Sequence, residues 1–147
     1  MRFASKIRPI GRIPPLWQHI RSILGSRTSH LPNLAEVTAD CIILGHTYAG
    51  RQTISLNQIR GSTTQARSRD FDANFRPLTR HNIDRWQHIA AAYRRGKRLS
   101  PVTLIEVNGV YFVEDGHHRI SVAKAENWSD IEAEVTVLQM TRALPWK

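Results

Sequence analysis

The fold is decided by one stretch of the sequence, Val110-Tyr111-Phe112-Val113-Glu114-Asp115-Gly116-His117-His118-Arg119. Its first four residues are apolar and favour a strand. Gly116 permits a sharp turn, after which a helix is expected over residues 117–126. Just upstream, Asn108-Gly109 predicts a tight hairpin, because a type I′ turn needs positive φ at both central residues. A partner strand is therefore expected over residues 101–106.

Further segments have the periodicity of regular elements. Residues 52–59 and 131–137 alternate between apolar and polar side chains, which predicts two half-buried strands. Residues 61–77 are polar and are expected to form a long loop, a feature that is often functional. A helix is expected over residues 82–95. The order strand, loop, helix, hairpin, helix, strand predicts an α+β fold in which helices pack on a small mixed sheet.

The helix over residues 82–95 has the clearest pattern. Its apolar side chains lie on one stripe that includes Trp86, which we expect in the core. Thr79 or Asn82 can cap its start, and Gly96 can end it. Basic residues gather at its C-terminal end, where they either complement the helix dipole or contact phosphates.

Length and composition limit the class of protein. The chain has 147 residues and one cysteine, so no disulfide can form within it. No apolar run approaches the roughly 20 residues of a membrane span. We expect a cytoplasmic location, although the basic, Ser-rich start is also typical of a transit peptide. Three parts are expected: a basic N-terminal extension with one or two short helices (1–49), a folded domain (50–140) and a tail (141–147).

Positive charge is concentrated in the first two-thirds of the chain. Lys and Arg number 21 against 12 Asp and Glu, which gives a net charge of +9. Residues 51–100 hold eleven basic and three acidic residues, whereas residues 101–147 hold four and seven. Such an excess is typical of proteins that bind nucleic acid or phosphorylated ligands, and equally of a solubilising surface. Non-specific DNA binding would use the basic arm (1–29) and residues 51–98.

The turn before the second helix has the features of a phosphate site. The first N–H groups of a helix have no partner within it, and the helix dipole favours an anion there. Gly116 permits close approach of a ligand, and Arg119 offers a planar fork for phosphate oxygens. His117 and His118 add donors whose charge can change near neutral pH. Asp115 fits as the N-cap. Zinc is not expected, because adjacent side chains on a helix point about 100° apart.

Five motifs occur in an order known from one superfamily. They are Leu99-Ser100-Pro101-Val102-Thr103-Leu104, the run from Gly109 to Arg119, Ala123-Lys124-Ala125, Trp128, and Ile131-Glu132-Ala133-Glu134-Val135. Over residues 52–138 the sequence thereby resembles the ParB/sulfiredoxin superfamily. Its members bind nucleotide phosphates at the corresponding turn: CTP in ParB, ATP in sulfiredoxin, and ADP or ATP in free-serine kinases. The resemblance implies that Gly116, His117, His118 and Arg119 hold the phosphates of such a nucleotide, with Mg²⁺ as its counterion.

The resemblance also gives roles to the polar loop, which would face the phosphate turn. The loop carries three arginines and two aspartates, Arg67, Arg69, Arg76, Asp70 and Asp72. Arg69 and Arg76 are implied as phosphate ligands. Because a carboxylate of the early loop is catalytic in the kinases, Asp70 and Asp72 are candidate catalytic residues, together with Asp115.

The sequence departs from the superfamily pattern at two points, and each removes one function from those that the resemblance implies. His117 stands where sulfiredoxins have a cysteine, so sulfinate reduction is not expected. About ten residues follow Val137, so the helix-turn-helix domain of partition ParB proteins is not expected there. Two functions remain open: a nucleotide-binding module that associates with DNA, or a small phosphotransferase or nucleotide hydrolase. A nuclease is a third alternative, and a homodimer is compatible with each.

Overall fold

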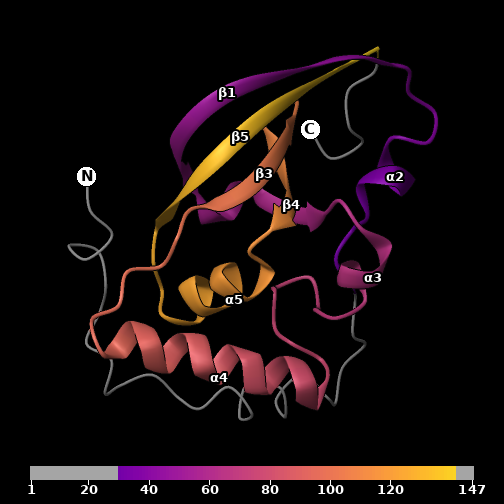
Figure 1. The fold of residues 1–147 in the computed structure, drawn as a ribbon. Helices are drawn as coiled ribbons and strands as arrows, with labels where there is room; N and C mark the ends of the chain where they lie inside the picture. Colours follow the sequence, from indigo (N-terminus) through magenta and orange to yellow (C-terminus); the bar gives the residue numbers. More distant parts are fainter. Residues whose placement is uncertain (1–29, 142–147) are drawn as a thin grey trace.

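A five-stranded sheet forms one layer of the molecule (Figure 1). The structure is a computed structural model that describes residues 30–141. In chain order the elements are α2 (Leu34–Val37), β1 (Ile43–Ser55), the 3₁₀ helix η3 (Leu56–Gln58), β2 (Ile59–Ser62), α3 (Gln65–Ser68), α4 (Arg80–Arg94), β3 (Val102–Val107), β4 (Val110–Asp115), α5 (His117–Ala125) and β5 (Asp130–Met140).

The sheet is mixed, as predicted. Its strand order is β1-β5-β3-β4-β2. The pairs β1–β5 and β3–β4 are antiparallel, whereas β3–β5 and β2–β4 are parallel. The hairpin at Asn108-Gly109 is confirmed, with φ of 52° and 81° at its two central residues. The predicted α+β class, a small mixed sheet with packed helices, is therefore confirmed.

The two longer helices are stacked on one face of the sheet, with α5 next to the strands and α4 beyond it (Figure 1). Ile120 and Ala123 of α5 belong to the main core together with residues of β3, β4 and β5. The other side of α5 presents Val122 to Trp86 and Ala90 of α4. Trp86 is buried, which confirms its predicted place in the core. Because α5 is covered on both sides, its position relative to the sheet is closely fixed.

β1 starts earlier than the sequence pattern indicated. It pairs with β5 from Ile43 opposite Met140 to Ser55 opposite Asp130, so the sheet includes residues 43–49 of the expected N-terminal extension. Most of these residues are exposed, which is why they show no in–out alternation. The segment expected as a single strand over residues 52–59 is the end of β1 followed by η3.

The loop over residues 61–77 is packed, which corrects its interpretation as a polar loop without regular structure. It contains the end of β2 and the short helix α3. Phe71 and Phe75 within it are completely buried in the main core. The burial of these two aromatic side chains therefore holds this segment over the start of α5.

Some expectations concern the chain outside the described range. Residues 1–29, with the first expected N-terminal helix, and the tail from residue 142 lie outside it. The second expected short helix corresponds to α2. No helix in the part of the chain that the structure describes is both long and apolar enough to cross a membrane.

Candidate functional site

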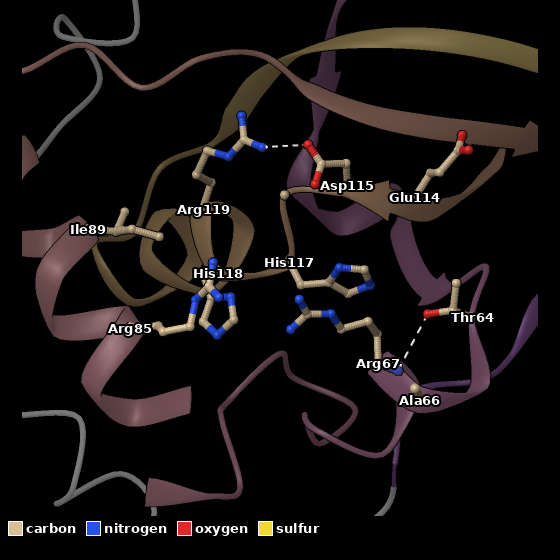
Figure 2. Close-up of a pocket in the computed structure, with 11 residues that line it drawn as sticks. Thr64, Ala66, Arg67, Arg85, Ile89, Glu114, Asp115, His117, His118 and Arg119 are labelled. Carbon is tan, nitrogen blue, oxygen red and sulfur yellow. Dashed lines mark hydrogen bonds and ion pairs between the residues drawn. The ribbon is translucent and has the colours of Figure 1, made fainter. Parts of the chain in front are cut away.

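A pocket of about 410 Å³ lies where β4 turns into α5 (Figure 2). Three parts of the chain line it, namely the β2–α3 region, α4 and the β4–α5 turn. The lining residues are Thr64, Ala66, Arg67, Arg85, Ile89, Glu114, Asp115, Gly116, His117, His118 and Arg119. All four residues predicted as the phosphate turn are thus brought to one cavity.

The conformation of Gly116 sets the course of the backbone along the pocket. It is the N-cap of α5 and has a φ of 109°, in the left-handed region that favours glycine. A Cβ atom at this position would lie 2.5 Å from Cγ1 of the buried Val102. Asp115 is not the N-cap that was predicted, because no side chain caps α5 and the Asp115 carboxylate turns instead to Arg119.

The two histidines are buried and held by neutral partners. His117 and His118 are 4% and 5% exposed. The Nε2 atom of His117 lies 2.8 Å from Oγ of Ser62, and Nε2 of His118 lies 2.9 Å from Oδ1 of Asn82. The Phe71 ring stacks on His117 at 5.8 Å and meets His118 edge-on at 5.1 Å. Both imidazoles therefore have fixed orientations before any ligand binds.

The hydrogen bonds of Asn82 define the neutral tautomer of His118. The amide Nδ2 of Asn82 donates to Oγ1 of Thr79 at 2.8 Å, so its Oδ1 atom faces the imidazole as an acceptor. Nε2 of His118 therefore donates, and Nδ1 has no proton in the neutral ring. Thr79 is also the N-cap of α4, so one hydroxyl supports both the helix and the histidine.

Burial and nearby arginines keep both histidines neutral. Desolvation lowers the pKa of His117 to about 4, with further lowering by Arg67 and His118. Desolvation likewise lowers the pKa of His118 to about 4, followed by the positive charges of Arg85 and Arg67. The predicted change of charge near neutral pH is thus moved to acidic pH.

Arg67 and Arg85 point toward the histidine pair from two sides (Figure 2). Arg67 lies on α3, whose start is capped by the Thr64 hydroxyl, and Arg85 lies on the exposed side of α4. Sequence reasoning placed Arg67 in the loop but missed Arg85. No local signal distinguishes Arg85 from other exposed helical arginines, because only the packing of α4 on α5 brings it to the pocket.

The guanidinium of Arg119 is held by hydrogen bonds within the protein, which the sequence did not predict. Its Nη1 donates to the carbonyl oxygens of Ser100 and Pro101, each at 2.9 Å, and its Nη2 donates to Oδ2 of Asp115 at 2.9 Å. These bonds connect α5 to the chain just before β3. Because a guanidinium has five N–H donors, some donors are left for a ligand.

The structure separates the other predicted site residues. Asp70 lies beside the pocket, with Oδ2 3.7 Å from Nη1 of Arg67. Asp72 is buried, and its Oδ1 accepts the backbone N–H groups of Asn74 and Arg76, so both Asp72 and Arg76 shape the loop. Arg69 lines a different cavity of about 300 Å³ near α2. The pocket lining therefore includes neither Asp72 nor Arg76 nor Arg69.

Comparison with known proteins gives a weak structural similarity. No family model and no curated protein matches the chain. A sulfiredoxin from Arabidopsis thaliana is similar at a TM-score of 0.40 and 21% sequence identity, over 58% of this chain and 82% of that one. A similarity of this extent does not assign the chain to a family.

Proposed function

We propose that the pocket at the β4–α5 turn binds the phosphate groups of a nucleotide. The observation that carries this proposal is the convergence of Arg67 and Arg85 on the N-terminal turn of α5. The N–H groups of a first helical turn and two guanidinium groups all favour a phosphate. Each cation comes from a different helix, so an anion between them would hold α3, α4 and α5 together.

A nucleotide is favoured over a smaller anion for two reasons. The pocket volume of about 410 Å³ lies within the roughly 300–1,000 Å³ typical of small-molecule sites. The sequence also resembles a superfamily whose members bind CTP, ATP or ADP at the corresponding turn.

Two carboxylates at the pocket, Glu114 and Asp115, oppose a bare anion but suit its metal complex. Mg²⁺ is commonly held by one or two carboxylates together with substrate phosphates. Glu114 and Asp115 are exposed at the end of β4. The Oδ2 atom of Asp115 accepts from Arg119, so the Oδ1 atom is the one left for a metal that enters with the nucleotide. We therefore infer that the ligand binds as its Mg²⁺ complex.

The same carboxylates favour a second candidate function, nucleotide hydrolysis or phosphoryl transfer. Of the three predicted catalytic residues, Asp115 alone lines the pocket. A carboxylate beside bound phosphates is placed to orient a water or an acceptor hydroxyl. Release of inorganic phosphate from the bound nucleotide distinguishes this function from binding alone.

Association with DNA, the remaining part of the proposal, is carried by the distribution of charge. Residues 30–141 contain 13 basic and 12 acidic residues, a net charge of +1. Residues 1–29 and 142–147 contain the other eight basic residues and no acidic ones. We therefore infer that residues 1–29 supply most of any attraction to DNA.

The binding proposal is tested by calorimetry of the full chain with CTP, ATP, ADP and GTP in the presence of Mg²⁺. Arg85→Gln is expected to weaken binding by about 1.5–3 kcal/mol, the range for a lost charge-assisted bond. Arg98→Gln removes the same charge at an exposed position outside the pocket lining and is expected to leave affinity unchanged. Equal affinity of both variants, or no binding of any nucleotide, contradicts the proposal.

A further inference from the structure

A second cavity of about 300 Å³ lies between α3 and the chain around the start of α2. Its volume is at the lower end of the roughly 300–1,000 Å³ range of small-molecule sites, so it suits a ligand of few atoms. Most of the side chains that line this α2–α3 cavity are polar, namely His30, Asn33, Glu36, Gln65, Ser68 and Arg69.

The short helix α3 stands between this cavity and the phosphate pocket. Ala66 and Arg67 line the phosphate pocket, whereas Gln65, Ser68 and Arg69 line the α2–α3 cavity. The two cavities share no lining residue. A ligand in the α2–α3 cavity would therefore lie on the other side of α3 from a bound nucleotide and is not expected to react with it.

Backbone hydrogen bonds hold the walls of the α2–α3 cavity together. The N–H group of Leu31 donates to the carbonyl oxygen of Ser68 at 3.2 Å, and the N–H group of Ser62 donates to that of Pro32 at 2.9 Å. Leu31 is also buried in the main core. The chain before α2 is thus fixed on β2 and α3, which gives the cavity a defined shape.

A buried amide in the cavity has donors without a partner. Asn33 is 5% exposed, and its Oδ1 atom accepts the N–H group of Ala35 at 2.9 Å as the N-cap of α2. Its Nδ2 atom donates to no acceptor within residues 30–141. Buried polar groups are ordinarily hydrogen-bonded. The Nδ2 atom therefore indicates a ligand that brings an acceptor into the cavity.

Two opposite charges line the same cavity without pairing. Glu36 and Arg69 are exposed, and neither forms an ion pair within residues 30–141. The guanidinium of Arg69 and the amide of Asn33 both favour a carboxylate, whereas Glu36 favours an ammonium group. A ligand that carries both groups matches the two charges, whereas a phosphate would be repelled by Glu36.

We propose that the α2–α3 cavity binds a free α-amino acid. The ligand carboxylate accepts from Nδ2 of Asn33 and from the guanidinium of Arg69, and the ligand ammonium donates to the carboxylate of Glu36. Because the two cavities share no lining residue, the proposal does not depend on nucleotide binding and can be tested without a nucleotide.

NMR titration of the ¹⁵N-labelled full chain with the proteinogenic L-amino acids tests the site. At least one amino acid is expected to shift the side-chain amide signals of Asn33 saturably at millimolar concentrations. The N-acetyl and carboxamide derivatives of that amino acid each lack one charge and should bind about tenfold more weakly or worse. No shift with any amino acid, or undiminished binding of either derivative, overturns the proposal.

Three variants test the assigned groups. Asn33→Asp keeps the acceptor that caps α2 but removes the amide donors, and Arg69→Gln and Glu36→Gln each remove one charge. Each should weaken binding about tenfold or more, measured from the backbone amide shifts of α3. Arg98→Gln and Asp40→Asn remove exposed charges outside the cavity lining and should leave affinity unchanged. Melting temperatures verify folding. Equal affinities of the three variants and the two controls overturn the proposal.

Discussion

The two edges of the sheet are built in opposite ways. At the β2–β4 edge, the segment after β2 folds over α5, and Phe71 and Phe75 fasten it into the core. At the β1–β5 edge, the first part of β1 is largely exposed. A site that must hold charged groups in fixed positions needs tightly packed neighbours. Of the two edges, only the β2–β4 edge provides them. The second edge offers backbone groups and apolar side chains, which suit association rather than chemistry.

The largest difference between the two edges is expected for removal of an aromatic ring. Phe71→Ala should lower the free energy of unfolding by about 3–5 kcal/mol, because this completely buried ring packs against both histidines. Tyr48→Ala at the exposed edge should change it by no more than about 0.5 kcal/mol. Urea denaturation of both variants measures this difference, and similar losses would contradict it.

Acid should lower the unfolding free energy of the chain through the two buried histidines at the packed edge. The pKa values of His117 and His118 are about 4 in the folded chain, below the ordinary value of 6.5. Folding therefore disfavours their protonation, so their contribution is complete above pH 6.5 and is lost as pH falls toward 4. The loss is expected to reach about 2 kcal/mol for each histidine at pH 5.

Unfolding free energies between pH 7 and pH 5 test this dependence. The variant His117→Asn/His118→Asn retains the carboxylates, so its pH profile reports every other titration in this range. The wild-type chain should lose more stability than the variant over the same interval. Parallel profiles would show that the histidines are not held neutral by the fold.

Two glycines with positive φ give a smaller and closely matched comparison. Gly116 has a φ of 109° and a Cβ there would meet Val102 at 2.5 Å, whereas Gly50 in β1 has a φ of 84° and open space around it. Gly50→Ala should cost about 1 kcal/mol for backbone strain alone, and Gly116→Ala about 2–3 kcal/mol. Gly116→Ala should also weaken nucleotide binding. Equal losses of unfolding free energy for the two substitutions would mean that Val102 moves aside to accept the new Cβ atom.

The smallest expected effect concerns residues 1–29. Their deletion should weaken DNA association and reduce its salt dependence, by about 0.9 log–log units for each DNA phosphate that the shortened chain no longer neutralises. Affinity for DNA across a salt series, together with calorimetry of the nucleotide, measures both activities. Nucleotide binding should persist, because the pocket lies within residues 64–119. Loss of both activities together would show that the segment supports the fold.

Most elements of the packed core could be predicted from the sequence, because their patterns are local. The Asn108-Gly109 turn, the apolar stripe of α4 and the alternation of β5 each require only neighbouring residues. The start of β1 could not be predicted, since exposed residues leave no alternation. The parallel pairing of β2 with β4 depends on residues that are distant in sequence.

The candidate site was predictable only in part. Gly116 and its neighbours are contiguous, so the turn was visible in the sequence, whereas Arg85 is brought to it by helix packing. The neutral state of the histidines also follows from the fold, because burial and then nearby arginines lower their pKa values. Asp72 was a candidate because the resemblance implies a catalytic carboxylate in this loop. In the structure its buried Oδ1 atom accepts the backbone N–H groups of Asn74 and Arg76.

NMR titration of the ¹⁵N-labelled full chain with Mg²⁺–ATP and Mg²⁺–CTP shows directly whether the pocket at the β4–α5 turn binds a nucleotide. At least one nucleotide is expected to shift the backbone amide signals of His117, His118 and Arg119 strongly, together with the side-chain signals of Arg67 and Arg85. Amides of β1 and β5, such as those of Thr47 and Val137, should remain in place. Saturable shifts confined to the β1–β5 edge, or no shifts at millimolar concentrations of either nucleotide, would contradict nucleotide binding at this turn.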